Sequence, residues 1–332
     1  MRRNILSLVY AVIVSLFLVV LVSCGKLKEE HVKTDNDTSL TKKSVGFSLA
    51  VTTNPFDVAE KKSLENSAKE NGFKAKFRDA RGKLTQQQAD IESLISEKIN
   101  YLVVVPVKEN GFKGIFYTAH QAGLPIILIN RSINGVPGKD FDALITSDGY
   151  WEGQAAAEWL LKNKEDKINV VQLVGTPGAS ITEARTAGFR AVARKHKRLK
   201  ILESKVCDFS KSAAYDKTKE TITIYTQTNV KVDAIFAQND NMALGAIEAI
   251  KDAGLNSLTK DILIIGIDGQ KEAKEAIEKG EMSATISSSP YYGSIVFKNI
   301  KDLEAGKKIE PVQTIKGKVY DKSNISELTT AF

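Results

Sequence analysis

The chain has too few cysteines and histidines for a disulfide framework or a histidine–cysteine metal site. Cys24 and Cys207 are the only cysteines, and we expect Cys24 to be modified, which leaves Cys207 without a partner. The three histidines, His31, His120 and His196, have no second histidine or cysteine at metal-ligand spacing. There is no GxxxxGK[ST] loop, and no GxGxxG follows an apolar run. We therefore expect no metal, no nucleotide and no other cofactor.

The chain also lacks a concentrated basic surface of the kind that binds nucleic acid. Its net charge is +7, and 26% of its residues are charged, which is typical of soluble globular proteins. The densest basic cluster, residues 194–200, follows a helical pattern and contains no interleaved aromatic residues. Positive charge suits the end of a solvated helix, so we expect no nucleic-acid partner.

Residues 1–23 have the order of a secretory signal. Two arginines are followed by an uncharged run from Asn4 to Ser23, and Cys24 comes next. A cysteine at the cleavage position resembles a bacterial lipoprotein signal, which implies that Cys24 carries a lipid and anchors the chain to the membrane. The alternative is an uncleaved anchor, because a run of this length can span a bilayer. Residues 24–43 are polar and indicate a flexible tether, so both readings place a tethered domain outside the cytoplasm.

From Val45 onward, short apolar runs alternate with amphipathic stretches. The runs are Val45–Val51, Tyr101–Val105, Pro125–Ile129, Asn169–Val174, Ala234–Ala237 and Ile262–Ile267. Continuous runs rich in valine and isoleucine are typical of parallel strands that are buried on both faces. The alternation predicts a doubly wound α/β fold. There are too many units for one convenient sheet, so we expect two sheets of about five or six strands each.

The two sheets predict two lobes joined by a hinge of several chain segments. We assign residues 44–146 and 288–311 to the N-terminal lobe. Residues 147–287 and 312–332 then form the C-terminal lobe.

Polar side chains follow the predicted strands at the point where each strand ends. They include Asn54, Asp57, Asn130, Arg131, Asn239 and Asp268. Ligands of open parallel sheets bind at the carboxyl ends of the strands, so we expect these side chains to meet in one cleft between the lobes. Carboxylates, amides and guanidinium groups form hydrogen bonds with hydroxyls, and an aromatic ring such as Phe56 can cover the C–H face of a sugar. The pattern favours a polyhydroxylated small molecule.

At these positions the sequence resembles the ribose-binding proteins, which are periplasmic receptors of sugar ABC importers. The resemblance covers about residues 44–310. It is carried by Asn54-Pro55-Phe56, Asn130-Arg131, Gly175–Ala179, Thr182–Arg185 with Gly188-Phe189, Ala237–Gly245, Gly266–Gly269 and Thr285-Ile286. It implies a type I periplasmic binding protein fold, a monomer, and an ABC permease as partner.

The resemblance also implies which residues contact the ligand. These are Asn54, Phe56, Asn130, Arg131, Asp148, Arg185, Phe209, Asn239 and Asp268. Three positions depart from the ribose receptors. Asp57 replaces a second phenylalanine, Asn130 replaces aspartate, and Ser288 stands where glutamine is expected. We count Asp57 and Ser288 among the candidate ligand contacts, and we predict a monosaccharide or polyol whose identity stays open.

Three other functions fit parts of the pattern. A receptor that feeds chemotaxis or quorum signalling would share the fold and differ in its membrane partner. A transcription regulator resembling the lactose-repressor core would carry an N-terminal helix-turn-helix, where this chain has a signal and a tether. A glycosidase could use a pair among Asp57, Asp148 and Asp268. No nucleophile–base pair is visible, so we predict a binding protein rather than an enzyme.

Overall fold

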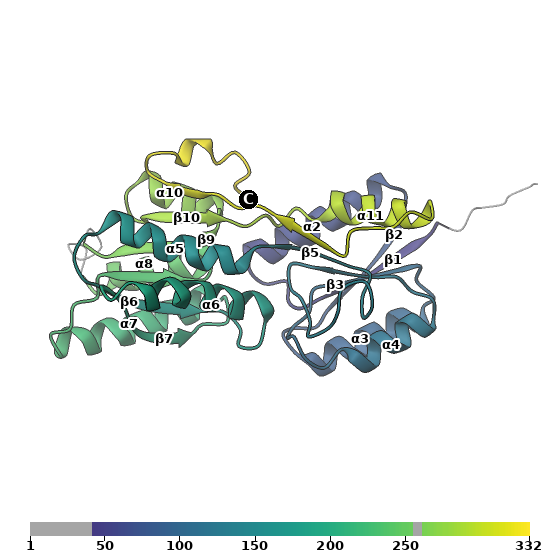
Figure 1. Cartoon of the computed structure of the whole chain (residues 1–332), viewed down its shortest axis with the longest axis horizontal. Helices are drawn as coiled ribbons and strands as arrows, with labels where there is room; N and C mark the ends of the chain where they lie inside the picture. The colour runs from purple at the N-terminus through teal and green to yellow at the C-terminus, as the bar shows by residue number, and fades with distance from the viewer. Residues whose placement is uncertain (1–41, 255–260) are drawn as a thin grey trace, which may run out of the picture. The chain divides into compact units, whose positions relative to one another are not determined.

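The computed structural model describes residues 42–254 and 261–332 (Figure 1). The predicted signal, Cys24 and nearly all of the predicted tether lie outside these residues. Within the described ranges, no helix has both the length and the apolar character needed to cross a bilayer.

The N-terminal lobe is built on a six-stranded parallel sheet with the order β11-β5-β4-β3-β1-β2. Its strands are β1 (Ser44–Leu49), β2 (Lys74–Asp79), β3 (Tyr101–Val104), β4 (Ile126–Ile129), β5 (Ala143–Ser147) and β11 (Val312–Ile315). Its helices are α2 (Pro55–Glu70), α3 (Leu84–Ser96), α4 (Lys113–Gln121) and α11 (Gly293–Glu304). Strands β1, β3 and β4 are buried along their whole length, between one apolar core that contains Phe47 and another that contains Leu102.

The C-terminal lobe has a second six-stranded sheet with the order β12-β10-β9-β8-β6-β7, in which only β12 is antiparallel to its neighbour. Its strands are β6 (Ile168–Val174), β7 (Leu199–Val206), β8 (Ala234–Ala237), β9 (Leu263–Asp268), β10 (Ala284–Ser287) and β12 (Val319–Asp321). Its helices are α5 (Gly149–Asn163), α6 (Ser180–Lys195), α7 (Lys211–Gln227), α8 (Asp240–Asp252), α10 (Lys271–Glu278) and the 3₁₀ turn η1 (Ile325–Glu327). Two doubly wound sheets confirm the fold class that the sequence predicts.

The chain passes between the lobes three times: after β5, after β10 and after β11. The last passage differs from the expected boundary between residues 311 and 312. Strand β11 pairs with β5, with Val312 opposite Leu144, so it belongs to the N-terminal lobe. Ser147 likewise ends a strand of that lobe. Strand β11 is a short, half-exposed edge strand, and such a strand leaves no apolar run that would assign it to a sheet.

Helices α5 and α6 pack against each other at two glycines. A Cβ atom on Gly153 would lie 2.1 Å from the carbonyl oxygen of Arg185, and one on Gly188 would lie 1.9 Å from that of Tyr150. Only glycine allows the two backbones to approach this closely. The contact brings Arg185 on α6 next to Glu152 on α5, and this pair lies at the site described below.

Candidate functional site

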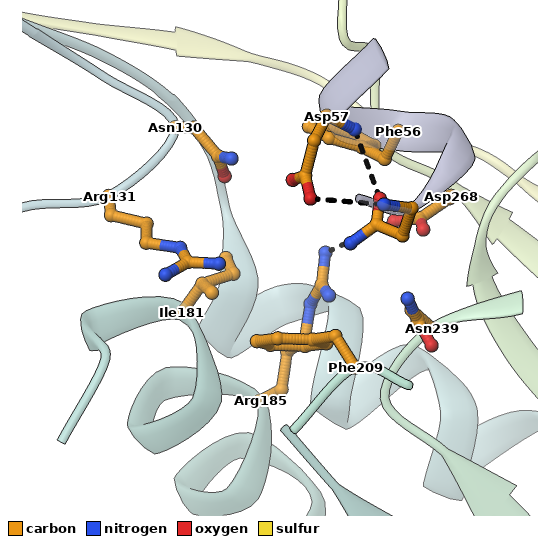
Figure 2. Close-up of a pocket in the computed structure, with 10 residues that line it drawn as sticks. Phe56, Asp57, Asn130, Arg131, Ile181, Arg185, Phe209, Asn239 and Asp268 are labelled. Carbon is orange, nitrogen blue, oxygen red and sulfur yellow. Dashed lines mark hydrogen bonds and ion pairs between the residues drawn. The ribbon is translucent and has the colours of Figure 1, made fainter. Parts of the chain in front are cut away.

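Side chains from both lobes line one small cavity with a volume of about 20 Å³ (Figure 2). It is lined by Asn54, Phe56, Asp57, Asn130 and Arg131 of the N-terminal lobe and by Ile181, Arg185, Phe209, Asn239 and Asp268 of the C-terminal lobe. Figure 2 shows the polar ends of Asp57, Asn130 and Arg185 pointing toward a shared centre. Nine of the eleven residues that the sequence analysis selects therefore lie around the same space.

Two selected residues lie outside the cavity lining, and one lining residue was missed. Asp148 is exposed and caps α5, where its carboxylate accepts a hydrogen bond from the Trp151 N–H at 2.9 Å. Ser288 is buried at a passage between the lobes, where its hydroxyl donates to Ser147 Oγ at 3.1 Å. Ile181 lies in the first turn of α6 and carries no polar group, so nothing in the sequence marks it as a lining residue.

The cavity residues at the start of α2 also cap that helix. The Asp57 N–H donates to Asn54 Oδ1 at 3.0 Å, and the Asn54 N–H donates to Asp57 Oδ2 at 3.4 Å. This reciprocal pair is a capping box, with Pro55 at the first helical position. The Asn239 side chain also caps a helix, α8, where it accepts a hydrogen bond from the Met242 N–H at 2.9 Å. The same side chains thus cap the helices and line the cavity.

Strained backbone marks the places where the strands end at the cavity. Asn130, Phe209 and Asp268 have φ values of 64°, 59° and 130°, which residues other than glycine rarely adopt. Such conformations cost about 1–3 kcal/mol each, and they are often found at ligand sites. Gly175 makes room for the Phe209 ring, because a Cβ there would lie 2.0 Å from Phe209 Cζ.

Contacts between the lobes keep the cavity closed. The Arg131 guanidinium lies 5.5 Å from the centre of the Phe209 ring, a cation–π contact from one lobe to the other. The Ser132 N–H donates to Ser180 Oγ at 2.7 Å, and the Glu109 N–H donates to the Gly178 carbonyl at 2.9 Å.

Arg185 is the charged centre of the C-terminal side of the cavity. Its Nε donates to Glu152 Oε2 at 2.8 Å, its Nη1 donates to the Gln238 carbonyl at 2.6 Å, and its Nη2 lies 3.8 Å from Asp268 Oδ1. Burial opposes the charge of Arg185, but the carboxylates of Glu152 and Asp268 leave its pKa raised overall. Burial raises the pKa of Asp268 well above its usual value, and Arg185 only partly offsets this.

A second buried charge cluster lies on the N-terminal side. Burial raises the pKa of Asp57 to about 6, against the opposing effect of Arg131. Burial raises the pKa of Glu60 to about 8, with a further contribution from Asp57. Burial also lowers the pKa of Arg131. Glu60, one turn beyond Asp57 on α2, was missed by the sequence analysis because an isolated helical glutamate normally faces water.

The cavity offers hydrogen-bond donors and acceptors from amide, carboxyl and guanidinium groups. Among residues 42–254 and 261–332, no three histidine, cysteine or acidic side chains come together as metal ligands. Burial raises the pKa of the Cys207 thiol to about 12, which keeps it in the unreactive thiol form. The arrangement suits reversible binding of a hydroxyl-rich molecule.

Comparison with known proteins assigns the family. The model of the periplasmic binding protein domain matches residues 45–308. The chain belongs to the periplasmic binding protein family. It is therefore a binding protein rather than an enzyme, as the sequence predicts, and its family places it outside the cytoplasm.

Relatives of this periplasmic binding protein cover most of its length. It is 31% identical to the ribose import binding protein of Bacillus subtilis (strain 168), over 90% of this chain and 94% of that protein. It is 32% identical to the galactofuranose-binding protein of Escherichia coli (strain K12), over 74% of this chain and 77% of that protein. The binding protein of the arabinose ABC transporter from Shewanella sp. ANA-3, solved with L-arabinofuranose, has a TM-score of 0.82 at 29% identity. That match covers 86% of this chain and 94% of the other.

Proposed function

We propose that this chain is a receptor that binds a monosaccharide or polyol in the cavity between its lobes and delivers it to an ABC-type importer. The observation that carries the proposal is the convergence of hydroxyl-binding side chains from both lobes on one enclosed space. The names of the relatives support a sugar ligand, and the ribose relative is named as an import protein. Import is therefore favoured over a role in chemotaxis or quorum signalling.

Binding would be coupled to closure of the lobes. The ligand contacts Asn54, Asn130 and Arg131 on one side and Arg185 and Asp268 on the other, so it stabilises only the arrangement in which the two sides meet. A ligand shifts such an equilibrium by its difference in affinity for the two forms. The importer then recognises the closed, loaded receptor.

The ligand is a neutral sugar in this proposal. Arg185 is already paired with the carboxyl groups of Glu152 and Asp268, and Arg131 lies among the buried acidic groups Asp57 and Glu60, so neither arginine is free to pair with a phosphate or a uronic acid. The Asp57 carboxyl group can form hydrogen bonds with the ligand on the side of the cavity where the ribose receptors have an aromatic ring. The proposal therefore leaves open a sugar other than ribose.

A screen of pentoses, hexoses and polyols by thermal shift, followed by calorimetry, tests this function. The Asp268→Ala variant should bind the best ligand roughly tenfold to a few hundredfold more weakly, since it leaves partner hydroxyls unpaired at about 1–3 kcal/mol per group. Asp166→Ala, which removes an exposed aspartate outside the cavity, serves as control. Equal affinity in the two variants would place the ligand elsewhere.

We further propose that Cys24 carries a lipid that anchors a monomeric receptor to the membrane. Its support is the signal pattern that precedes the cysteine. The Cys24→Ala variant should be released from membranes or accumulate as an uncleaved precursor. Mass spectrometry that finds an unmodified Cys24 inside a continuous N-terminal segment would contradict this.

A further inference from the structure

The last residues of the sequence pack against both lobes. Ile325 and Leu328 are buried in a core of the C-terminal lobe, and Lys274 Nζ donates to the Leu328 carbonyl at 3.0 Å. Ala331 packs against that same core. Phe332, the next residue, packs instead against the core of the N-terminal lobe. Two consecutive residues thus belong to the apolar cores of different lobes.

Phe332 is held by its backbone on one side and by its ring on the other. Its carbonyl accepts a hydrogen bond from the Lys271 N–H, at the start of α10, at 3.0 Å. Its ring lies edge-on against Phe56, with 5.7 Å between the ring centres and 81° between the planes. A second edge contact, at 6.4 Å, joins it to Tyr291 in the segment that passes between the lobes.

Phe56 lines the cavity, so the ring contact reaches the binding site. Phe56 lies in the first turn of α2, between the cavity residues Asn54 and Asp57. Phe332 does not line the cavity itself and stands behind Phe56. Edge-to-face aromatic pairs prefer a defined mutual orientation, so the Phe332 ring restricts how the Phe56 ring can turn.

We infer that Phe332 is a positioning residue of the binding site, which backs the Phe56 ring and fastens the start of α2 to the C-terminal lobe. The inference rests on the proposed function. Without this ring, Phe56 gains freedom and α2 loses a non-covalent tie to the opposite lobe. A smaller fraction of molecules then has the geometry that binds sugar, and the apparent affinity falls by that fraction.

The test compares Phe332→Ala with Phe77→Ala. Phe77 is also half-buried against the core of the N-terminal lobe, and it also has an aromatic partner, Phe47, at 4.5 Å. It lies on β2 and does not line the cavity. Both variants should lose similar thermal stability. Only Phe332→Ala should lose sugar affinity. The expected loss is roughly threefold to tenfold, which corresponds to the interaction free energy of one aromatic pair.

Two further variants separate positioning from general loosening. Phe332→Leu keeps an apolar side chain behind Phe56 and should recover much of the affinity. In a Phe56→Ala background, Phe332→Ala should weaken binding little further, because the contact is already gone. The loss of sugar affinity should appear as a higher dissociation rate, because most affinity differences between variants of one interface arise from dissociation.

The outcomes distinguish this inference from the function on which it rests. The probes are D-ribose, L-arabinose, D-fructose, D-galactose and myo-inositol, measured by calorimetry on the full chain. If neither these probes nor any other pentose, hexose or polyol of the screen binds the unaltered protein, both the function and the inference are wrong. If one binds and Phe332→Ala binds it equally well, only the inference is wrong. An equal loss of affinity in Phe77→Ala would also overturn it, because the effect would then be general.

Discussion

Replacing Glu60 with glutamine should remove a large part of the pH dependence of folding stability. Glu60 is 1% exposed on α2, next to Asp57, Asn130 and Arg131. Burial raises its pKa from the ordinary value of 4.5 to about 8. The folded protein therefore holds this carboxyl protonated at neutral pH, whereas the unfolded chain has it ionised.

The sign and size of the effect follow from proton linkage. Between about pH 4.5 and about pH 8 the folded state binds one more proton than the unfolded state at this position, so the free energy of unfolding falls as pH rises. The slope approaches about 1.4 kcal/mol per pH unit, and the total loss from this group is about 5 kcal/mol. Above about pH 8 both states are ionised, and the slope from Glu60 disappears.

The Glu60→Gln variant keeps the shape of the protonated acid and cannot ionise. Urea unfolding of both proteins from pH 4 to pH 9 should therefore show similar stability at the acid end and a variant that is several kcal/mol more stable at the alkaline end. Asp57, Asp240 and Asp268 also have raised pKa values, but they act alike in both proteins. Glu65→Gln, an exposed position on the same helix, is the control. Parallel pH profiles for Glu60→Gln and the unaltered protein would refute the reasoning.

Two further predictions concern the cavity and the α5–α6 contact. Arg131→Lys should weaken sugar binding by about tenfold or more, since an ammonium group lacks the planar fork and its stacking on Phe209; calorimetry that finds unchanged affinity would exclude Arg131 as a contact. Gly188→Ala should destabilise the fold by about 1–3 kcal/mol or more, because the new methyl group meets the Tyr150 carbonyl. Gly114→Ala, at a helical glycine whose Cβ position has no atom within 4 Å apart from its chain neighbours and the backbone of its own helix, should instead keep or raise the thermal midpoint.

The sequence predicts the central strands well and the edge strands poorly. Strands β1, β3, β4 and β8 are buried on both faces, so their apolar runs are visible in the sequence. Strands β2, β7, β11 and β12 lie at sheet edges and are partly exposed, so their residues are mixed in character. The sheet to which such a strand belongs depends on pairing with distant residues. The sequence therefore predicts β11 in the C-terminal lobe, whereas its pairing with β5 puts it in the N-terminal lobe.

The same contrast applies to the cavity. Asn130, Asn239 and Asp268 are predictable because each lies at or just after the carboxyl end of a buried strand, at an edge where ligands bind. Arg185 lies on a helix and was found only through the resemblance to ribose receptors. Glu60 and Ile181 escaped notice because a helical glutamate and a helical isoleucine are common everywhere. Only the three-dimensional packing reveals that these two side chains lie beside the site.

The pairing of β11 with β5 has a consequence for the order in which the protein folds. Val312 lies opposite Leu144, although half of the chain separates them. The N-terminal lobe therefore cannot complete its sheet until nearly the whole chain is available, including helices α5 to α10 of the C-terminal lobe and most of its strands. Contacts between such distant segments slow folding, since a long loop must close first. An exported chain that emerges N-terminus first would therefore expose the unpaired edge of β5 until β11 is available. Unpaired strand edges promote aggregation, so the chain is most prone to aggregate at this stage.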